Sequence, residues 1–210
     1  MKKTMLCALV AASLALPAVA SATPLRPGPY VSGFIGVSAP PSIDATGAFD
    51  DRISFNPGLN VGATAGYDLG GFRLEGEISY KDNPVDTILD RNTGVRYTGV
   101  EGDIEATAFM VNAFFDLHNL TPITPYLGGG VGFAALHQSD TYDHFGNFFY
   151  AADDQVVFAY QAGGGLEVAI NPQLSLDLGY RYFRTSKASF ADTELELENH
   201  NATIGLRVKF

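Results

Sequence analysis

The chain has no tryptophan, a single cysteine and few basic residues, with 13 Lys and Arg against 23 Asp and Glu. Cys7 lies in a segment that we expect to be removed, and no lipidation pattern surrounds it, so neither a disulfide nor a lipid anchor is expected in the mature protein. A formal net charge of −10 argues against a nucleic-acid partner, because binding phosphates needs a basic face. After the first residues no run of about 18 apolar residues occurs, which excludes a helical membrane span.

The N-terminal segment has the parts of a secretory signal peptide. Lys2 and Lys3 precede a mostly apolar stretch that extends to Leu16, and small residues follow it. Cleavage after Ala20 and cleavage after Ala22 fit the small-x-small rule equally well. We therefore expect a cleaved signal peptide at residues 1–22, a short N-terminal segment at 23–28 and a single folded domain at 29–210.

Apolar and polar residues alternate along most of the remaining chain. In segment 72–81 the even positions are apolar apart from Gly76, and the odd positions are charged or hydroxylic. In a β-strand these two sets lie on opposite faces. The same alternation predicts about eight strands in all, the others being 30–37, 59–69, 109–117, 126–135, 155–168, 174–183 and 200–210.

The lengths of the connections distinguish a barrel from a soluble β-sandwich, which would also alternate. Short links at 68–71, 118–124 and 170–173 strictly alternate with long, acidic links at 39–58, 82–103, 138–154 and 185–194. This arrangement is typical of a bacterial outer-membrane barrel with short periplasmic turns and long extracellular loops. The sequence therefore predicts an all-β fold, namely an eight-stranded antiparallel up-and-down transmembrane β-barrel with both termini in the periplasm.

The polar face of such a barrel points inward, because the apolar face meets lipid. About eight strands leave an interior only wide enough for side chains. The inward charges have both signs and are therefore expected to pair, giving a plugged core without a wide channel. This predicted network consists of Arg73, Glu75, Glu77, Lys81, Asp116, Glu167, Asp177, Arg181, Arg207 and Lys209.

Four segments resemble the opacity-type and surface-antigen outer-membrane β-barrel family, which is related to the OmpA-type transmembrane domain and often labelled a porin family. They are ATAFMVNAFFD (106–116), TPYLGGGVG (124–132), AYQAGGG (159–165) and LGYRYF (178–183). The resemblance implies a surface protein of the outer membrane that is sometimes adhesive, and it supplies no catalytic residue. The leading hypothesis is therefore a non-enzymatic surface barrel without a cofactor that contributes to envelope integrity. We expect it to contact membrane lipid and lipopolysaccharide, and to make adhesive or ligand contacts through its extracellular loops.

The final strand ends on an aromatic residue, Phe210, after alternating apolar positions. The resemblance implies that the outer-membrane assembly machinery recognises such a strand, so Phe210 is the predicted assembly signal. The same strand must pair with segment 30–37 to close the cylinder.

The third long link concentrates aromatic residues among acids. Exposed aromatic side chains often mark a contact surface. The alternative is that these rings fold over the barrel mouth or lie in the lipopolysaccharide layer. The candidate ligand contacts are Tyr142, Phe145, Phe148, Phe149 and Tyr150.

His137 and Ser139 share one face of a strand, an arrangement that resembles the one in outer-membrane lipid A deacylases, where histidine activates serine. No acidic partner for His137 is evident on that strand face. A lipid A-modifying enzyme is therefore the less favoured alternative to a surface protein. The other alternative is a narrow porin-like channel. The four histidines show no metal-ligand spacing, so no metal site is expected.

Overall fold

A computed structural model describes residues 27–47, 51–98, 102–117, 119–139, 141–142, 148–150, 153–190 and 193–210. Within these ranges the chain forms β-strands, and no helix is long and apolar enough to cross a membrane. The predicted signal peptide lies outside the described residues and stays a prediction.

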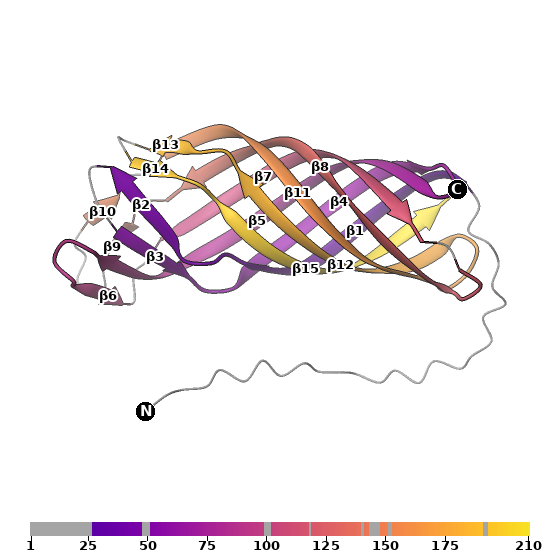
Figure 1. The fold of residues 1–210 in the computed structure, drawn as a ribbon, viewed down its shortest axis with the longest axis horizontal. Helices are drawn as coiled ribbons and strands as arrows, with labels where there is room; N and C mark the ends of the chain where they lie inside the picture. The colour runs from indigo at the N-terminus through magenta and orange to yellow at the C-terminus, as the bar shows by residue number, and fades with distance from the viewer. Residues whose placement is uncertain are drawn as a thin grey trace, which may run out of the picture.

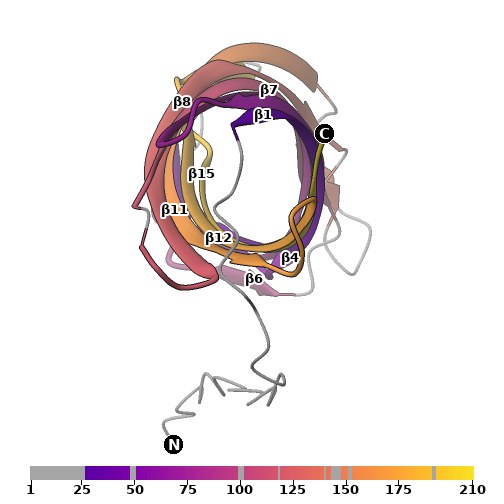
Figure 2. The ribbon, with the colours of Figure 1, turned by 90° about the vertical axis from the view of Figure 1, so that its right-hand side faces the viewer.

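Eight long strands form a closed ring (Figures 1 and 2). Each strand pairs antiparallel with the next in the ring. The first and last strands pair from Tyr30 opposite Lys209 to Ala39 opposite His200, which leaves the ring without a free edge. The predicted fold class is therefore confirmed. The strands are β1 (Gly28–Ala39), β4 (Gly58–Asp68), β5 (Phe72–Asp90), β7 (Asp103–Asp116), β8 (Ile123–Gln138), β11 (Asp153–Ala169), β12 (Leu174–Thr185) and β15 (Glu198–Lys209).

The short connections share one kind of turn chemistry. Asp68, Asn119 and Asn171 each accept a hydrogen bond from a backbone amide two residues further on. Asp and Asn side chains stabilise tight turns in this way. Gly70 has a φ of 87°, a conformation that glycine adopts without steric cost. These turns all lie at the end of the barrel that carries the C-terminus, called the turn end below (Figure 1).

The opposite end, the loop end, contains more strand than the acidic loops predicted from the sequence. Strands β13, β14, β2, β3, β5 and β6 pair in this order and join three of the long links into one sheet, called the extracellular sheet below. Its small apolar core consists of Ile53, Val85 and Ile88. The pairing of β14 with β2 joins segments from opposite ends of the chain, so no local pattern could have indicated it. The short strands are β2 (Ile43–Gly47), β3 (Asp51–Phe55), β6 (Arg96–Thr98), β9 (Thr141–Tyr142), β10 (Phe148–Tyr150), β13 (Ala188–Phe190) and β14 (Thr193–Leu195).

Candidate functional site: the barrel interior and the extracellular sheet

Ion pairs fill the interior at the turn end. Arg207 donates hydrogen bonds to Glu167 and, at 3.0 Å, to Asp177. Arg73 lies 3.0 Å from Asp116 and 3.3 Å from Glu167. These side chains come from β5, β7, β11, β12 and β15, so the network ties much of the ring together. A further pair, from Lys209 to Asp68 at 2.8 Å, links β15 to β4.

A second group of charges lies nearer the middle of the barrel. Arg181 pairs with Glu77 and lies 3.5 Å from Glu75. Glu77 also accepts hydrogen bonds from Asn112 at 2.8 Å and from Gln161 at 3.0 Å. Both carboxylates are almost completely buried, so they depend on Arg181 and these amides for compensation. Together with the pairs at the turn end, this group is called the charged core below.

Aromatic rings complete the charged core. The guanidinium of Arg73 lies 4.7 Å from the ring centroid of Tyr126, and that of Arg207 lies 4.9 Å from the centroid of Tyr30. Tyr126 donates a hydrogen bond to Asp177 at 2.7 Å, and Tyr30 donates one at 2.9 Å to a carboxylate of the second group. The predicted network omitted these two tyrosines and Asp68. The inward parity of their strands was the signal that could have found them.

Lys81 stands apart from these pairs. It donates a hydrogen bond to Ser79 at 2.9 Å, and its ammonium lies 4.3 Å from the ring centroid of Phe183. Its side chain is 2% exposed. Lys81 therefore marks the boundary between the charged core and the apolar region that follows it toward the loop end.

Apolar side chains fill the interior at the loop end, where the sequence analysis expected the polar face to continue. We call this group, with the alanines and Met110 that pack beside it, the apolar core. Phe55 from β3 packs against both this group and the core of the extracellular sheet. Alternation did not reveal it because residues 133–136 are apolar on both faces. Apart from Met110 and the alanines, its members are Ile104, Leu136, Val157, Phe183 and Leu197.

His137 lies on the outer face near the loop end, together with a carboxylate that the sequence analysis did not find. Its Nδ1 lies 2.6 Å from an oxygen of Asp154, which is directly opposite on β11. The prediction that His137 lacks an acidic partner was therefore wrong. The predicted pair with Ser139 does not form among the described residues. Instead, the Ser139 hydroxyl accepts a hydrogen bond from the Asp103 amide at 2.8 Å.

The extracellular sheet carries two arginines on the face opposite its apolar core. Arg52 lies opposite Leu89 in register, and Leu89 lies opposite Arg96 on the next strand. Both arginines are exposed, and Leu89 is half-buried between them. This row, called the arginine row below, places two cationic groups on either side of an apolar side chain.

Arg184 and Glu196 form a bidentate pair at the rim of the barrel, with hydrogen bonds of 2.7 and 2.8 Å. The hydrogen bonds from Arg184 hold the pKa of the Glu196 carboxyl below its usual range. Beside the pair, the Leu197 amide donates to the Thr185 hydroxyl at 3.1 Å. These contacts attach the last long link to the end of β12.

The remaining candidates lie at the two ends of the molecule. In the third link, β9 and β10 pair antiparallel and place Tyr142 opposite Phe148. Phe145 lies outside the described residues, and Phe149 and Tyr150 belong to β10. At the turn end, the Phe210 amide donates to the carbonyl of Pro29 at 3.1 Å, and its side chain is exposed.

Comparisons with known proteins agree with this architecture. Residues 6–210 match the family described as outer membrane protein beta-barrel domain. The outer membrane protein PagN of Salmonella typhimurium is 30% identical over 108 residues, which are 50% of this chain and 45% of PagN. The chain thus spans less than half the length of that relative.

Two solved structures share the fold at low sequence identity. Neisserial surface protein A has a TM-score of 0.55 and 19% identity, with 87% of this chain and 97% of that chain covered. OprG from Pseudomonas aeruginosa has a TM-score of 0.58 and 13% identity, with 87% and 96% covered. At these identities the likeness concerns the fold alone.

Proposed function

The chain belongs to the outer membrane protein beta-barrel family, and on this premise we propose that it is a non-enzymatic surface protein with a sealed barrel. Its role is to contribute to envelope integrity and to contact an extracellular partner through the extracellular sheet. Membrane lipid and lipopolysaccharide surround its outer face, where large apolar side chains such as Val111 and Phe133 are exposed.

The observation that carries this proposal is the folded extracellular sheet. A chain whose only task was to span the membrane would need short links at both ends. Here three long links pair with one another and bury Ile53 and Ile88 in a core of their own. Burial of apolar side chains stabilises this sheet, so it presents a defined surface above the barrel.

The arginine row is the part of this surface with the most specific chemistry. Arginine forms charge-assisted, bidentate hydrogen bonds with carboxylate, sulfate-like and phosphate groups. Two arginines on either side of Leu89 therefore suit an anionic polymer with apolar patches. The aromatic residues Tyr142, Phe145, Phe148, Phe149 and Tyr150 remain proposed as additional contacts.

Binding of cells that express the protein to immobilised sulfated and uncharged polysaccharides tests this contact. Replacing Arg52 and Arg96 with serine is expected to reduce retention on the sulfated surface at least fivefold. The matched control is Asp86→Ser, which removes an exposed charge of the opposite sign from β5 and is expected to leave retention unchanged or raise it. Equal retention of the arginine variant and the parent chain would contradict the proposal.

The sealed interior predicts that the barrel carries no wide channel. Ion pairs fill the turn end, and apolar side chains fill the loop end. A planar-bilayer recording of the purified protein is expected to show no steady conductance in the nanosiemens range. Such a conductance would instead support the porin-like alternative.

One observation favours an enzyme as the second candidate, namely the His137–Asp154 pair. In hydrolases a carboxylate orients histidine in this way. The His137–Asp154 pair has no serine nucleophile beside it among the described residues, because the Ser139 hydroxyl is hydrogen-bonded to the backbone of Asp103. We expect His137→Ala to leave lipid A acylation of the expressing cells unchanged, and a loss of deacylated species would favour the enzyme.

Phe210 is proposed as a signal for the outer-membrane assembly machinery. Its exposed ring is not required to fill the barrel, and strand β15 closes the ring without it. Deleting Phe210 is expected to reduce the amount of folded, heat-modifiable protein in the outer membrane. The protein that does assemble should bind the polysaccharide surface as the parent does. Wild-type levels after the deletion would refute the assembly role.

A further inference from the structure

Three asparagines inside the barrel have side-chain oxygens that accept no hydrogen bond from any residue that the structure describes. Asn60 lies on β4, and Asn199 and Asn201 lie on β15. Each of them is at most 3% exposed. A buried polar atom without a hydrogen bond costs free energy, so almost all such atoms in native proteins bond to protein groups or to bound water. These three oxygens therefore need a donor.

A hydrogen-bonded network fixes the direction of the Asn199 amide. Asn83 donates from Nδ2 to the backbone carbonyl of Ile104 at 3.0 Å, so its Oδ1 faces the other way. That oxygen accepts hydrogen bonds from Ser38 at 2.8 Å and from Nδ2 of Asn199 at 3.3 Å. Turning the Asn199 amide over would place two carbonyl oxygens against each other. The Oδ1 of Asn199 must therefore point away from this network.

The backbone orients Asn201 in the same way. Its Nδ2 donates to the carbonyl oxygens of Arg181 and Asn199 at 3.3 and 3.4 Å, which directs its Oδ1 away from both strands' backbones. Arg181 is directly opposite Asn201 in register and keeps 13% of its side chain exposed, although it points inward. The interior beside Asn201 therefore has space for molecules of the size of water.

Lys81 brings a cation to the same part of the interior. It is directly opposite Asn60 in register, and its ammonium reaches the ring of Phe183 on β12, 4.3 Å from the centroid. Phe183 in turn is directly opposite Asn199. An ammonium group carries three N–H donors. Among the described residues it has one acceptor, the Ser79 hydroxyl at 2.9 Å.

These groups limit the chemistry of an occupant. It must accept hydrogen bonds from the ammonium and donate them to the asparagine oxygens. A metal cation cannot accept a hydrogen bond, and a chloride ion cannot donate one, whereas water does both. The site is also closed, by the completely buried Ser38, Asn83 and Asn199 on its loop-end side and by the charged core on its turn-end side. A larger polar solute is therefore excluded.

We propose that water bound in the barrel interior links the ammonium of Lys81 to the side-chain oxygens of Asn60, Asn199 and Asn201. About two water molecules are enough, because each donates two hydrogen bonds and the three oxygens need one each. This hydrated site allows the barrel to keep a buried lysine that has no carboxylate partner. The site is enclosed, so it opens no channel, and it does not depend on the extracellular contact proposed above.

NMR of the isotope-labelled protein in lipid nanodiscs tests the proposal. Rotating-frame cross peaks between water and side-chain amides report close contact and differ in sign from chemical exchange. Asn112 is the internal control, because it is equally buried but its Oδ1 accepts a hydrogen bond from Gln161 at 2.8 Å. Cross peaks to Asn199 and Asn201 are expected to be at least fivefold stronger than those to Asn112. Equal intensities at the three residues would overturn the proposal.

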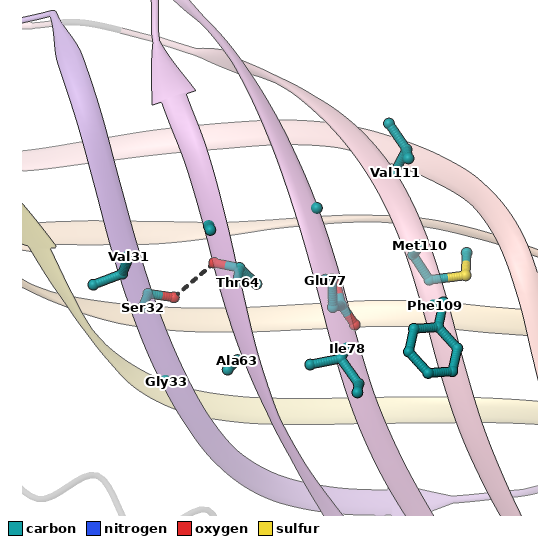
Figure 3. Close-up of a pocket in the computed structure, with 12 residues that line it drawn as sticks. Val31, Ser32, Gly33, Ala63, Thr64, Glu77, Ile78, Phe109, Met110 and Val111 are labelled. Carbon is teal, nitrogen blue, oxygen red and sulfur yellow. Dashed lines mark hydrogen bonds between the residues drawn. The ribbon is translucent and has the colours of Figure 1, made fainter.

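Lys81→Met provides the second arm, because it removes the cation and keeps most of the side-chain volume. The cross peaks to Asn199 and Asn201 are expected to weaken at least threefold. The matched control is Ser32→Ala, which removes another inward polar group, 3.0 Å from the Thr64 hydroxyl and nearer the turn end (Figure 3). It should leave the cross peaks unchanged.

Cross peaks at the parent intensity in Lys81→Met would show that the lysine is not part of the site and would reject the proposed link. Heat-modifiable migration verifies the folding of both variants. If Lys81→Met does not fold, the comparison with Asn112 in the parent protein still decides.

The parent protein also tests an anion as the occupant. The shifts of the Lys81 Cε methylene are compared after refolding with chloride or with sulfate as the only added anion. They are expected to change no more than those of Lys187, which is exposed. A larger change at Lys81 would show that an anion occupies the site and would reject water.

Discussion

The two halves of the barrel interior are filled by side chains of opposite character. At the turn end, arginines, lysine and carboxylates fill the space and must all be paired. At the loop end, leucine, isoleucine, valine and phenylalanine fill it and need no partners. The inner face of a membrane barrel therefore need not be polar, provided that its side chains fill the interior. It also predicts that the two halves respond differently to substitution.

The largest effect is expected in the charged core. Arg181→Met keeps most of the side-chain volume but leaves Glu75 and Glu77 without their arginine. Breaking a buried pair in this way costs about 3–5 kcal/mol of unfolding free energy. Urea titration in lipid vesicles measures the loss. Arg184→Met, on the same strand but in a rim pair, is the control and should cost less than about 1 kcal/mol. Equal losses for the two variants would contradict the distinction.

A smaller loss is expected in the apolar core. Leu136→Ala removes a fully buried side chain that is 1% exposed, and the resulting cavity costs about 2–5 kcal/mol. Leu127→Ala on the same strand faces outward, where lipid fills the space, so its effect in the same titration should be well below half as large. A bilayer recording of Leu136→Ala should still lack nanosiemens conductance, because the charged core remains closed. Conductance in this variant would show that the apolar core alone seals the barrel.

Lys81 lies at the boundary between the two halves of the interior. Its ammonium has no partner carboxylate within an ion-pair distance among the described residues, and it lies against Phe183. Burying a charge without an ion-pair partner costs free energy, and an apolar side chain of similar volume removes that cost. Lys81→Met should therefore change the unfolding free energy by less than about 1.5 kcal/mol or raise it. A loss above about 3 kcal/mol would assign Lys81 to the charged core.

The smallest effect concerns the rim, outside both halves. Because the pKa of Glu196 is lowered in the folded chain, its pair with Arg184 contributes stability above the ordinary carboxyl pKa and loses it as pH falls through the lowered value. Acidification below about pH 4 should then lower the protection factor of the Leu197 amide, taken relative to its intrinsic exchange rate at each pH, while the amides of the charged core keep their protection factors. Glu196→Gln should show the lowered protection factor already at neutral pH. If the protection factor of Leu197 does not change across this pH range, the Arg184–Glu196 pair does not stabilise the rim.

The sequence predicted the barrel because its strongest signals are local. Alternation with period two assigns side chains to faces, and turn residues such as Asp68 and Gly70 separate the strands. The ten predicted charges all belong to inward positions for this reason. What alternation could not supply is which charges meet: Arg181 pairs with Glu77 across 104 residues of chain. Nor does it identify the acidic partner of His137, since Asp154 lies on the neighbouring strand.

The number of barrel strands, their inner and outer faces, and the alternation of short and long links follow from the sequence alone, because each depends on neighbouring residues. The partners within the charged core, the apolar core, and the extracellular sheet that β14 and β2 complete became known from the three-dimensional structure. These features depend on side chains brought together by ring closure and strand register. Alternation with period two predicts on which face of the sheet each side chain lies. It does not predict the register between strands, and so it does not predict which distant residues are neighbours inside the barrel.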